Sequence, residues 1–199
     1  MSDRVSRFFL DSGNLALDLV NTLQPSDGVE ADQLRSPADL LTWLGEAGLF
    51  EHPERLGPLR SPPTARTLLS EARHLRDDVS RAVTSLAAGG SVPTHVVYAI
   101  NRVLAAGRVT PSLHVDDNGA RLEETEDGDS TLATLVPVAR AAAELVVEAD
   151  PGRLRRCASE TCERWFIDTS KGGRRKWCSM ATCGNRAKAA AHRRRHVSA

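Results

Sequence analysis

Residues 157–183 read CASETCERWFIDTSKGGRRKWCSMATC and hold every cysteine of the chain, in two pairs spaced Cys157-x4-Cys162-x15-Cys178-x4-Cys183. Two close pairs separated by a short insert can converge on one tetrahedral ion, because each pair supplies two thiolates from a tight turn. With four thiolates and no spare cysteine, the spacing predicts a single structural Zn²⁺ ion as the cofactor of this segment.

The four cysteines also have other interpretations. Two disulfides would require an oxidising compartment, yet the N-terminal MSDRVSRFFLDSG has too short an apolar stretch for a secretory signal. A catalytic thiol would be expected to act with a distant histidine rather than within two cysteine pairs. Four cysteines also ligate iron–sulfur clusters, so the ligand set alone does not exclude one. Since no run approaches the length of a membrane span, the sequence predicts a cytoplasmic protein without membrane contact.

Charge divides the chain into two parts. Residues 153–199 carry thirteen Lys and Arg against three acids, a net charge of +10, whereas the first 152 residues carry −10. The neutrality of the whole chain is therefore a cancellation, and the basic part by itself suits a polyanionic partner. The boundary falls at Ala149-Asp150-Pro151-Gly152, where Pro and Gly end a helical pattern. We therefore expect one domain over 1–150 and a second over 151–199.

Within the basic part, residues 164–168 and 175–178 are expected to form the two strands of a hairpin. Ser170-Lys171-Gly172-Gly173 would make the turn between them, and the metal would lie at the open end. The stretch after Cys183 is rich in Ala and Arg and has a strong helix propensity. The last cysteine is therefore expected at a helix start.

Several of these residues resemble a known family. Cys183-Gly184-Asn185-Arg186, preceded by Trp165-Phe166 and Trp177-Cys178, is similar to the CGNR-type zinc finger, a treble-clef-like module at the C-terminus of bacterial transcription regulators. The stretches LDLVNT at 17–22 and SPADLLTWL at 36–44 resemble its companion, the ABATE domain, described as a stress-induced transcription regulator. The resemblance implies that the chain binds DNA and works in the cytoplasm.

The basic residues of the finger are the candidates for contacts with DNA. The helix after Cys183 has no wide apolar face, so its own protein would hold it poorly. Its small Ala side chains would let the backbone approach a groove while arginines reach phosphates or guanine edges. The alternative for the last arginines is a solvated basic tail. The predicted DNA contacts are Arg174, Arg175, Lys176, Arg186, Lys188, Arg193, Arg194 and Arg195.

Three further residues are expected to support the finger. Asn185 at the helix start can hydrogen-bond a cysteine sulfur and so hold the metal ligands in place. Trp165 and Trp177 are expected in the core of a small domain that has little else to bury, although aromatic rings can also stack on bases. For Arg186, support of the metal ligands and contact with a base both remain open.

The first 150 residues are predicted to be mainly helical, with one small hairpin. Ser36-Pro37-Ala38-Asp39 combines an N-cap, a first-turn proline and a first-turn acid. Pro137 within the last helical pattern implies a kink or a later start. The expected helices are 15–23, 36–48, a long one from Pro62-Pro63 to Gly89-Gly90, 93–106 and 132–148, and the expected strands are 110–115 and 120–125. Along the long helix, apolar residues recur at spacings of three and four and form one stripe: Leu68, Ala72, Leu75, Val79, Val83 and Leu86.

The acidic N-terminal part shows no sign of an active site. It has no Gly-rich phosphate loop and no nucleophile motif, and its histidines at 52, 74, 95 and 114 are scattered. Asp18 and Asn21 lie one turn apart on an apolar helix, either as a buried polar network or as anchors for a small effector. We therefore expect not an enzyme but a sensing or homodimerising domain joined to a DNA-binding finger. The alternative is an RNA- or protein-binding zinc module without operator specificity.

Overall fold

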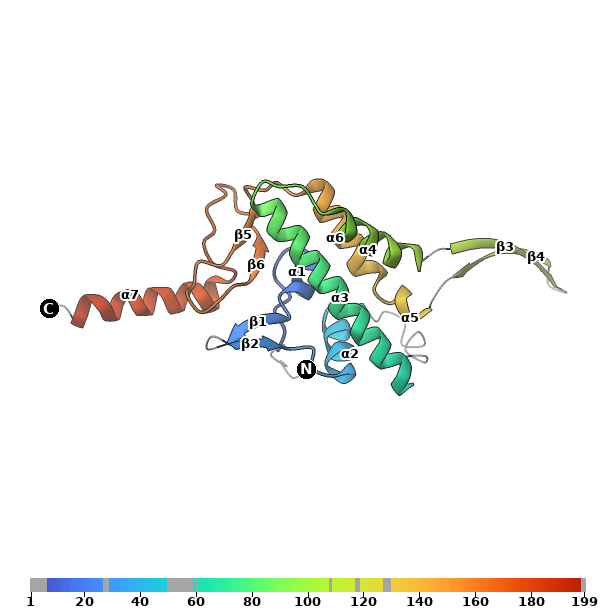
Figure 1. The fold of residues 1–199 in the computed structure, drawn as a ribbon, viewed down its shortest axis with the longest axis horizontal. Coiled ribbons are helices and arrows are strands. Elements are labelled where there is room, and N and C mark those ends of the chain that lie inside the picture. Colours follow the sequence, from blue (N-terminus) through green and yellow to red (C-terminus); the bar gives the residue numbers. More distant parts are fainter. Residues whose placement is uncertain are drawn as a thin grey trace.

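Helices form the body of the protein, which carries residues 154–197 at one end and the paired strands 109–116 and 119–126 at the other (Figure 1). The computed structural model describes residues 7–26, 29–49, 59, 61–107, 109–116, 119–126 and 130–197. Within these ranges, no helix combines the length and the apolar character needed to cross a membrane. The predicted fold class, mainly α with a small hairpin and a C-terminal four-cysteine finger, is confirmed.

The elements have the following bounds. The helices are α1 Leu15–Val20, α2 Pro37–Glu46, α3 Pro62–Ala87, α4 Thr94–Ala105, α5 Ser130–Ala133, α6 Val136–Glu148 and α7 Asn185–Val197. The strands pair antiparallel as β1 Leu23–Ser26 with β2 Val29–Asp32, β3 Val109–Asp116 with β4 Gly119–Glu126, and β5 Leu154–Arg156 with β6 Trp165–Ile167. The helices predicted for the N-terminal part and its β3–β4 hairpin are therefore present.

The helix ends follow local sequence signals. The Ser36 hydroxyl accepts a hydrogen bond from the Asp39 N–H, and the Asp39 carboxylate accepts one from the Ser36 N–H. This reciprocal capping satisfies two backbone donors at the start of α2. Pro62 begins α3, and Pro137 lies in the first turn of α6, where proline loses no helical hydrogen bond. Of the two interpretations of Pro137, the later start is the correct one.

The main core gathers around α1. This short helix contacts α3 and α6, and α3 contributes its predicted apolar stripe to the same core. Leu17 and Leu19 of α1 and Val83 of α3 are completely inaccessible to solvent. Burying each of these side chains contributes about 1.5–3 kcal/mol. The LDLVNT stretch therefore lies at the centre of the N-terminal part.

The β1–β2 hairpin lies where the sequence predicted the end of a helix and a loop. Pro25 within β1 weakens the strand signal, because proline cannot donate to a ladder and is confined to edge strands. Leu23 pairs with Asp32 and Ser26 with Val29, while residues 27–28 fall outside the described part. The hairpin brings Gln24 next to the C-terminal segment.

A partly buried ion pair joins this hairpin to α3. The two carboxylate oxygens of Asp32 accept hydrogen bonds from Arg76 at 2.7 and 3.0 Å. The Nε of Arg73 lies 3.3 Å from Asp32 Oδ2. The Arg76 side chain is only 5% exposed. Burial opposes ionisation of Asp32, but the hydrogen bonds from Arg76 prevail and lower the pKa of its carboxyl.

Asp32→Asn is expected to reduce the free energy of unfolding by up to about 3 kcal/mol near neutral pH, because it leaves the buried Arg76 guanidinium with only the half-exposed carboxylate of Asp77, 3.5 Å from its Nε, as a counter-charge. Since folding lowers the pKa of Asp32, the stabilisation is present above its unfolded value of 3.8 and is lost as the pH falls through the folded value. Urea unfolding of both proteins across this pH range measures the difference.

Asp78→Asn provides the matched control, since the partner of Asp78, Arg81, is 57% exposed. Its expected effect is below about 1 kcal/mol at every pH. A difference for Asp32→Asn that stays constant as the pH falls below 3.8 would contradict the role of the charge.

Candidate metal centre and nucleic-acid interface

The four cysteine sulfurs form one compact cluster. All lie within 4.8 Å of one another, with Cys162 Sγ 3.7 Å and Cys183 Sγ 3.8 Å from Cys178 Sγ. A tetrahedral ion with Zn–S bonds of about 2.3 Å places its ligands about 3.8 Å apart, whereas disulfide sulfurs lie about 2.05 Å apart. A cluster of several irons would separate the thiolates more widely, because the irons lie between them. The predicted site for one Zn²⁺ is therefore confirmed.

Two local structures hold these cysteines. Cys157 and Cys162 come from the loop that joins β5 to β6, where the Cys157 N–H donates to the Arg164 carbonyl at 2.9 Å. Cys183 lies in η3, the wide turn Met180–Gly184 that leads directly into α7. The last ligand therefore stands at a helix start, as predicted.

The close approach of four thiols couples their ionisation. The hydrogen bond between Cys162 and Cys178 lowers the pKa of Cys162 to about 5 and, together with burial, raises the pKa of Cys178. Burial also raises the pKa of Cys183. The Cys178 N–H donates to the Cys157 sulfur at 3.4 Å. Because the thiolates repel one another, a divalent cation is needed for all four to ionise together.

The strand pairing around the cysteines differs from the prediction. β6 pairs with β5, and residues 175–178 form no strand. The reason is Asp168, whose carboxylate accepts hydrogen bonds from the Ser170 N–H, the Ser170 hydroxyl and the Arg175 N–H at 2.9, 2.5 and 2.8 Å. These bonds fold residues 168–175 into a closed loop around the predicted turn. The Arg175 N–H, which the predicted strand would have used for pairing, is thereby bonded to Asp168.

Aromatic side chains on alternate faces of β6 serve two different cores. Phe166 is fully buried beside the cysteines, where Phe9 from the N-terminal segment and the half-buried Trp177 pack against the same cluster. Trp165 is buried in the main core with the residues of α1 and α3. Because neighbouring residues of a strand face opposite sides, β6 links the metal centre to the body of the protein.

Known families match both halves of the chain. Residues 13–149 match the family model ABATE, "Putative stress-induced transcription regulator". The chain belongs to the ABATE family. Residues 153–196 match the CGNR zinc finger, so the resemblance predicted from the sequence is confirmed in both halves and indicates a regulatory, zinc-binding protein. A search of curated proteins found no match.

Asn21 joins the ABATE domain to the CGNR finger. Its side-chain NH2 donates to the Trp165 carbonyl, and its side-chain oxygen accepts from the Trp165 N–H, both at 2.9 Å. Next to it, the Ser12 carbonyl accepts from the Ile167 N–H at 2.8 Å. The carboxamide of Asn21, only 1% exposed, therefore takes the place of a peptide group in a third strand beside β6.

Asp18, the other predicted ligand-binding residue, has a different partner. Its carboxylate accepts from the Ser12 N–H at 3.1 Å, and burial raises the pKa of its carboxyl although this hydrogen bond opposes the rise. Gly13, with φ of +87°, permits the turn that brings Ser12 against both Asp18 and β6. These contacts match the buried-network interpretation, and effector binding by Asp18 and Asn21 stays a prediction.

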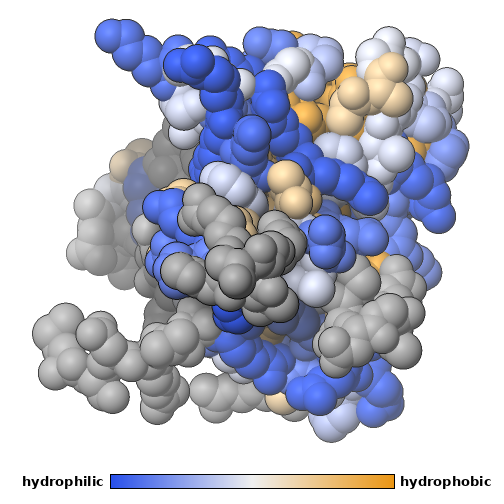
Figure 2. All heavy atoms as spheres, turned by 90° about the vertical axis from the view of Figure 1, so that its left-hand side faces the viewer, coloured by the Kyte–Doolittle hydropathy of each residue, from blue (hydrophilic) through white to orange (hydrophobic). Residues whose placement is uncertain are grey.

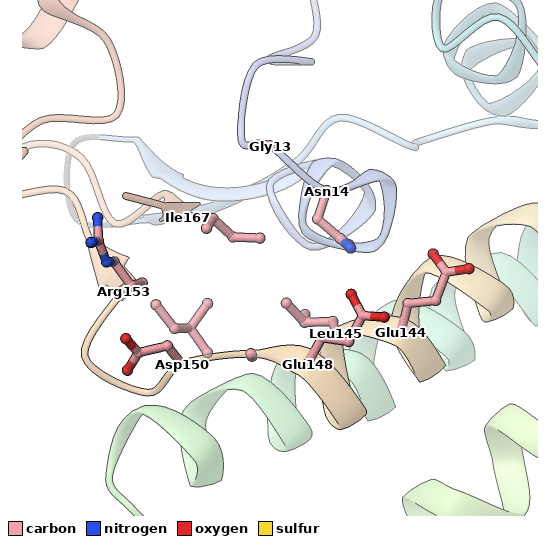
Figure 3. Close-up of a pocket in the computed structure, with 10 residues that line it drawn as sticks. Gly13, Asn14, Glu144, Leu145, Glu148, Asp150, Arg153 and Ile167 are labelled. Carbon is pink, nitrogen blue, oxygen red and sulfur yellow. The ribbon is translucent and has the colours of Figure 1, made fainter. Parts of the chain in front are cut away.

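A cavity of about 420 Å³ lies where the ABATE domain meets the finger (Figure 3). Asn14 at the start of α1, Glu144 and Glu148 of α6, and Arg153 and Ile167 of the finger contribute to its walls. Asn14 donates to a carbonyl of α6, and Arg153 donates to two carbonyls of the finger. Asn14 and Arg153 are therefore each bonded within their own domain, and neither predicted effector residue lines the cavity.

The predicted DNA contacts in the loop 174–176 have unequal surroundings. Arg174 and Lys176 are exposed. Arg175 donates to the carbonyls of Trp177 and Cys178 and lies over the Phe166 ring, 4.6 Å from its centroid. Its guanidinium is thus held by the finger itself, next to the metal ligands, and a contact of Arg175 with DNA stays a prediction.

The other predicted contacts lie on α7, which projects from the finger away from the body (Figure 1). Its principal contact is with η3, and Lys188 and Arg193 are exposed. Figure 2 shows that mostly hydrophilic residues surround α7 on the face from which it projects. The side chains of residues 194–197 lie outside the described part, so the contacts of Arg194 and Arg195 stay predictions.

Two residues of the CGNR motif hold the start of α7 in place. The Asn185 side chain donates to the Ala181 carbonyl at 3.2 Å, and Arg186 donates to the Thr161 hydroxyl at 2.9 Å. Asn185 therefore secures the turn that carries Cys183. Arg186 connects α7 to the loop of the first cysteine pair while remaining exposed.

Proposed function

We propose that this protein is a DNA-binding transcription regulator in which α7 lies in a groove of the duplex. The observation that carries the proposal is the composition and placement of α7, which has five Lys and Arg, no acidic residue and, over the part whose side chains the structure describes, little packing against the rest of the protein. An isolated helix of this length is marginal in water. Docking on a polyanion would stabilise it through contacts of its cationic side chains with phosphates.

The ABATE domain, in this proposal, regulates the finger that it holds. It does so by binding a small effector or by pairing two copies of the chain, in the cytoplasm and without catalysing a reaction. The rigid attachment through Asn21 and β6 supports this role, because a change in α1 would reach the metal centre through one strand.

Lys188→Ala and Arg193→Ala are each expected to weaken binding to all DNA sequences and to reduce the salt slope by about 0.9 for each phosphate that the variant no longer neutralises. Fluorescence anisotropy with the zinc-loaded full chain and labelled duplexes, titrated at several salt concentrations, measures both quantities. Arg66→Ala is the matched control, because Arg66 is exposed near the start of α3, and the start of α3 lies far from α7 (Figure 1). Equal affinity and slope in all three variants would exclude α7 from the interface.

Selection of bound fragments from genomic DNA, followed by sequencing, separates a regulator from its rival. A shared sequence element among the fragments would support operator recognition. Uniform coverage, or a preference for RNA over DNA in competition, would favour an RNA-binding or nonspecific module, since a zinc-finger fold does not fix the function.

A further inference from the structure

A small polar cavity lies between the finger, the start of α7 and the β1–β2 hairpin. Its volume is about 290 Å³, at the lower end of the range for small-ligand sites. The ABATE domain contributes two carboxamides and the finger contributes two guanidiniums, two hydroxyls and two metal ligands. These residues are Gln24, Gln33, Arg164, Arg186, Thr161, Thr182, Cys162 and Cys183.

Two arginines meet at this cavity, and its described lining contains no carboxylate. Arg186 donates to the Thr161 hydroxyl, which engages one of the five N–H donors of a guanidinium. Arg164 lies over the Phe9 ring, 4.8 Å from its centroid, and its Nε–H is buried without a hydrogen-bond partner. The cavity is therefore lined by two cationic side chains, and the buried Nε–H of one of them lacks a hydrogen-bond partner.

Gln33 adds a second buried polar atom without a partner. Its Oε1 is unpaired, while its Nε2 is 3.5 Å from the Arg7 carbonyl. A carboxamide can rotate to present its NH2 in place of its oxygen, so Gln33 can donate to a ligand as well. Buried polar atoms are ordinarily hydrogen-bonded, so neither unpaired atom opposes a reorientation of the Gln33 and Arg164 side chains toward a polar ligand in the cavity that both residues line.

The arginines also face the negative charge of the metal centre. One Zn²⁺ and four thiolates leave a net charge of −2, and Cys162 and Cys183 line the cavity. Neutralising this charge explains why two guanidiniums are present. It does not explain the cavity itself, the threonine hydroxyls or the carboxamides that a different domain contributes.

We infer that this cavity binds one phosphate group. Guanidiniums match phosphate oxygens with two parallel hydrogen bonds, and the hydroxyl and carboxamide groups can donate to the remaining oxygens. The phosphate belongs either to the DNA backbone beside α7 or to a small phosphorylated molecule. The first source rests on the proposed function, and the second does not.

Calorimetric titration of the zinc-loaded full chain with inorganic phosphate tests this site without DNA. Sodium chloride at equal ionic strength controls for screening. Arg164→Gln and Arg186→Gln are each expected to weaken phosphate binding by about tenfold or more, since each removes a charge-assisted contact. Arg174→Gln removes one exposed charge from the same finger outside the cavity, and it should bind phosphate like wild type.

Gln33→Ala keeps the test decisive if an arginine variant loses zinc or fails to fold. It changes the cavity from the ABATE side, away from the metal ligands, and should also weaken phosphate binding. Binding of phosphate to wild type no tighter than that of chloride, or equal phosphate affinity in wild type and Gln33→Ala, would overturn the inference.

The salt dependence of DNA binding identifies the source of the phosphate. If the cavity holds a DNA phosphate, Arg164→Gln will reduce the salt slope by about 0.9 and free phosphate will compete with DNA. If the ligand is a small phosphorylated molecule, the variant will lose phosphate binding while its DNA salt slope stays unchanged. Either result supports a phosphate site, and the calorimetric result stands even if the protein binds no DNA.

Discussion

Removal of zinc is expected to unfold residues 154–183 and to loosen the ABATE core as well. The metal contributes on the order of 10 kcal/mol to a small zinc domain, and apart from the cysteines the core of this finger consists only of Phe166, Phe9 and Trp177 among the described residues. Without the metal, β6 loses one of its two anchors. The position of Trp165 in the main core is then less strongly fixed.

Hydrogen exchange read by mass spectrometry, before and after chelation, follows both domains at once. The finger should lose its protection entirely, α1 should lose part of it, and α4 at the far side of the core should change least. Restoring one equivalent of zinc should reverse all three effects. Full protection of 154–183 in protein shown by elemental analysis to be free of metal would contradict a structural role for zinc.

Asn21→Ala is expected to lower the free energy of unfolding by about 3 kcal/mol, because it leaves the N–H and the carbonyl of Trp165 buried without partners. Asn21→Asp makes the test sharper. The aspartate side chain is nearly the same size as that of asparagine and still accepts from the Trp165 N–H. It has an oxygen, however, in place of the NH2 that donates to the Trp165 carbonyl. We expect it to destabilise the protein at least as much as Asn21→Ala.

Denaturant unfolding with one probe in each domain measures these effects. In wild type the two probes should report one transition, and in the Asn21 variants the finger should unfold first. Asn101→Ala on the exposed face of α4 is the matched control, with an expected effect within about 0.5 kcal/mol. Coincident transitions in Asn21→Ala, with a destabilisation of less than about 1 kcal/mol, would show that the domains do not depend on this residue.

Features with a local cause could be predicted from the sequence. The spacing of four cysteines identified the metal ligands, because two close pairs can each supply two thiolates to one tetrahedral ion. Ser36 and Asp39 identified the start of α2, since capping involves residues three apart. The period of apolar residues along α3 likewise identified its buried face.

Features that depend on distant partners were missed or left open. Asn21 contacts a residue 144 positions away, so nothing near it in the sequence distinguishes this contact from a cap or a ligand site. Its only signal in the sequence was a polar pair, Asp18 and Asn21, on a mostly apolar helix. The Asp168 carboxylate accepts a hydrogen bond from the Arg175 N–H, and this bond prevents the predicted strand. Phe9 and Arg164 meet from opposite ends of the chain, and neither carries a motif.

The shared strand β6 also restricts how this protein can change over generations. A small zinc module with a self-contained core folds on its own once it binds its metal. In this protein, separating the finger from the ABATE domain near residue 150 would expose Trp165 to solvent. It would also leave the backbone groups of β6 that bond Asn21 and Ser12 without partners. The two halves are therefore expected to be inherited together. Asn21 is expected to vary less than the positions around it, because it bonds the backbone of β6.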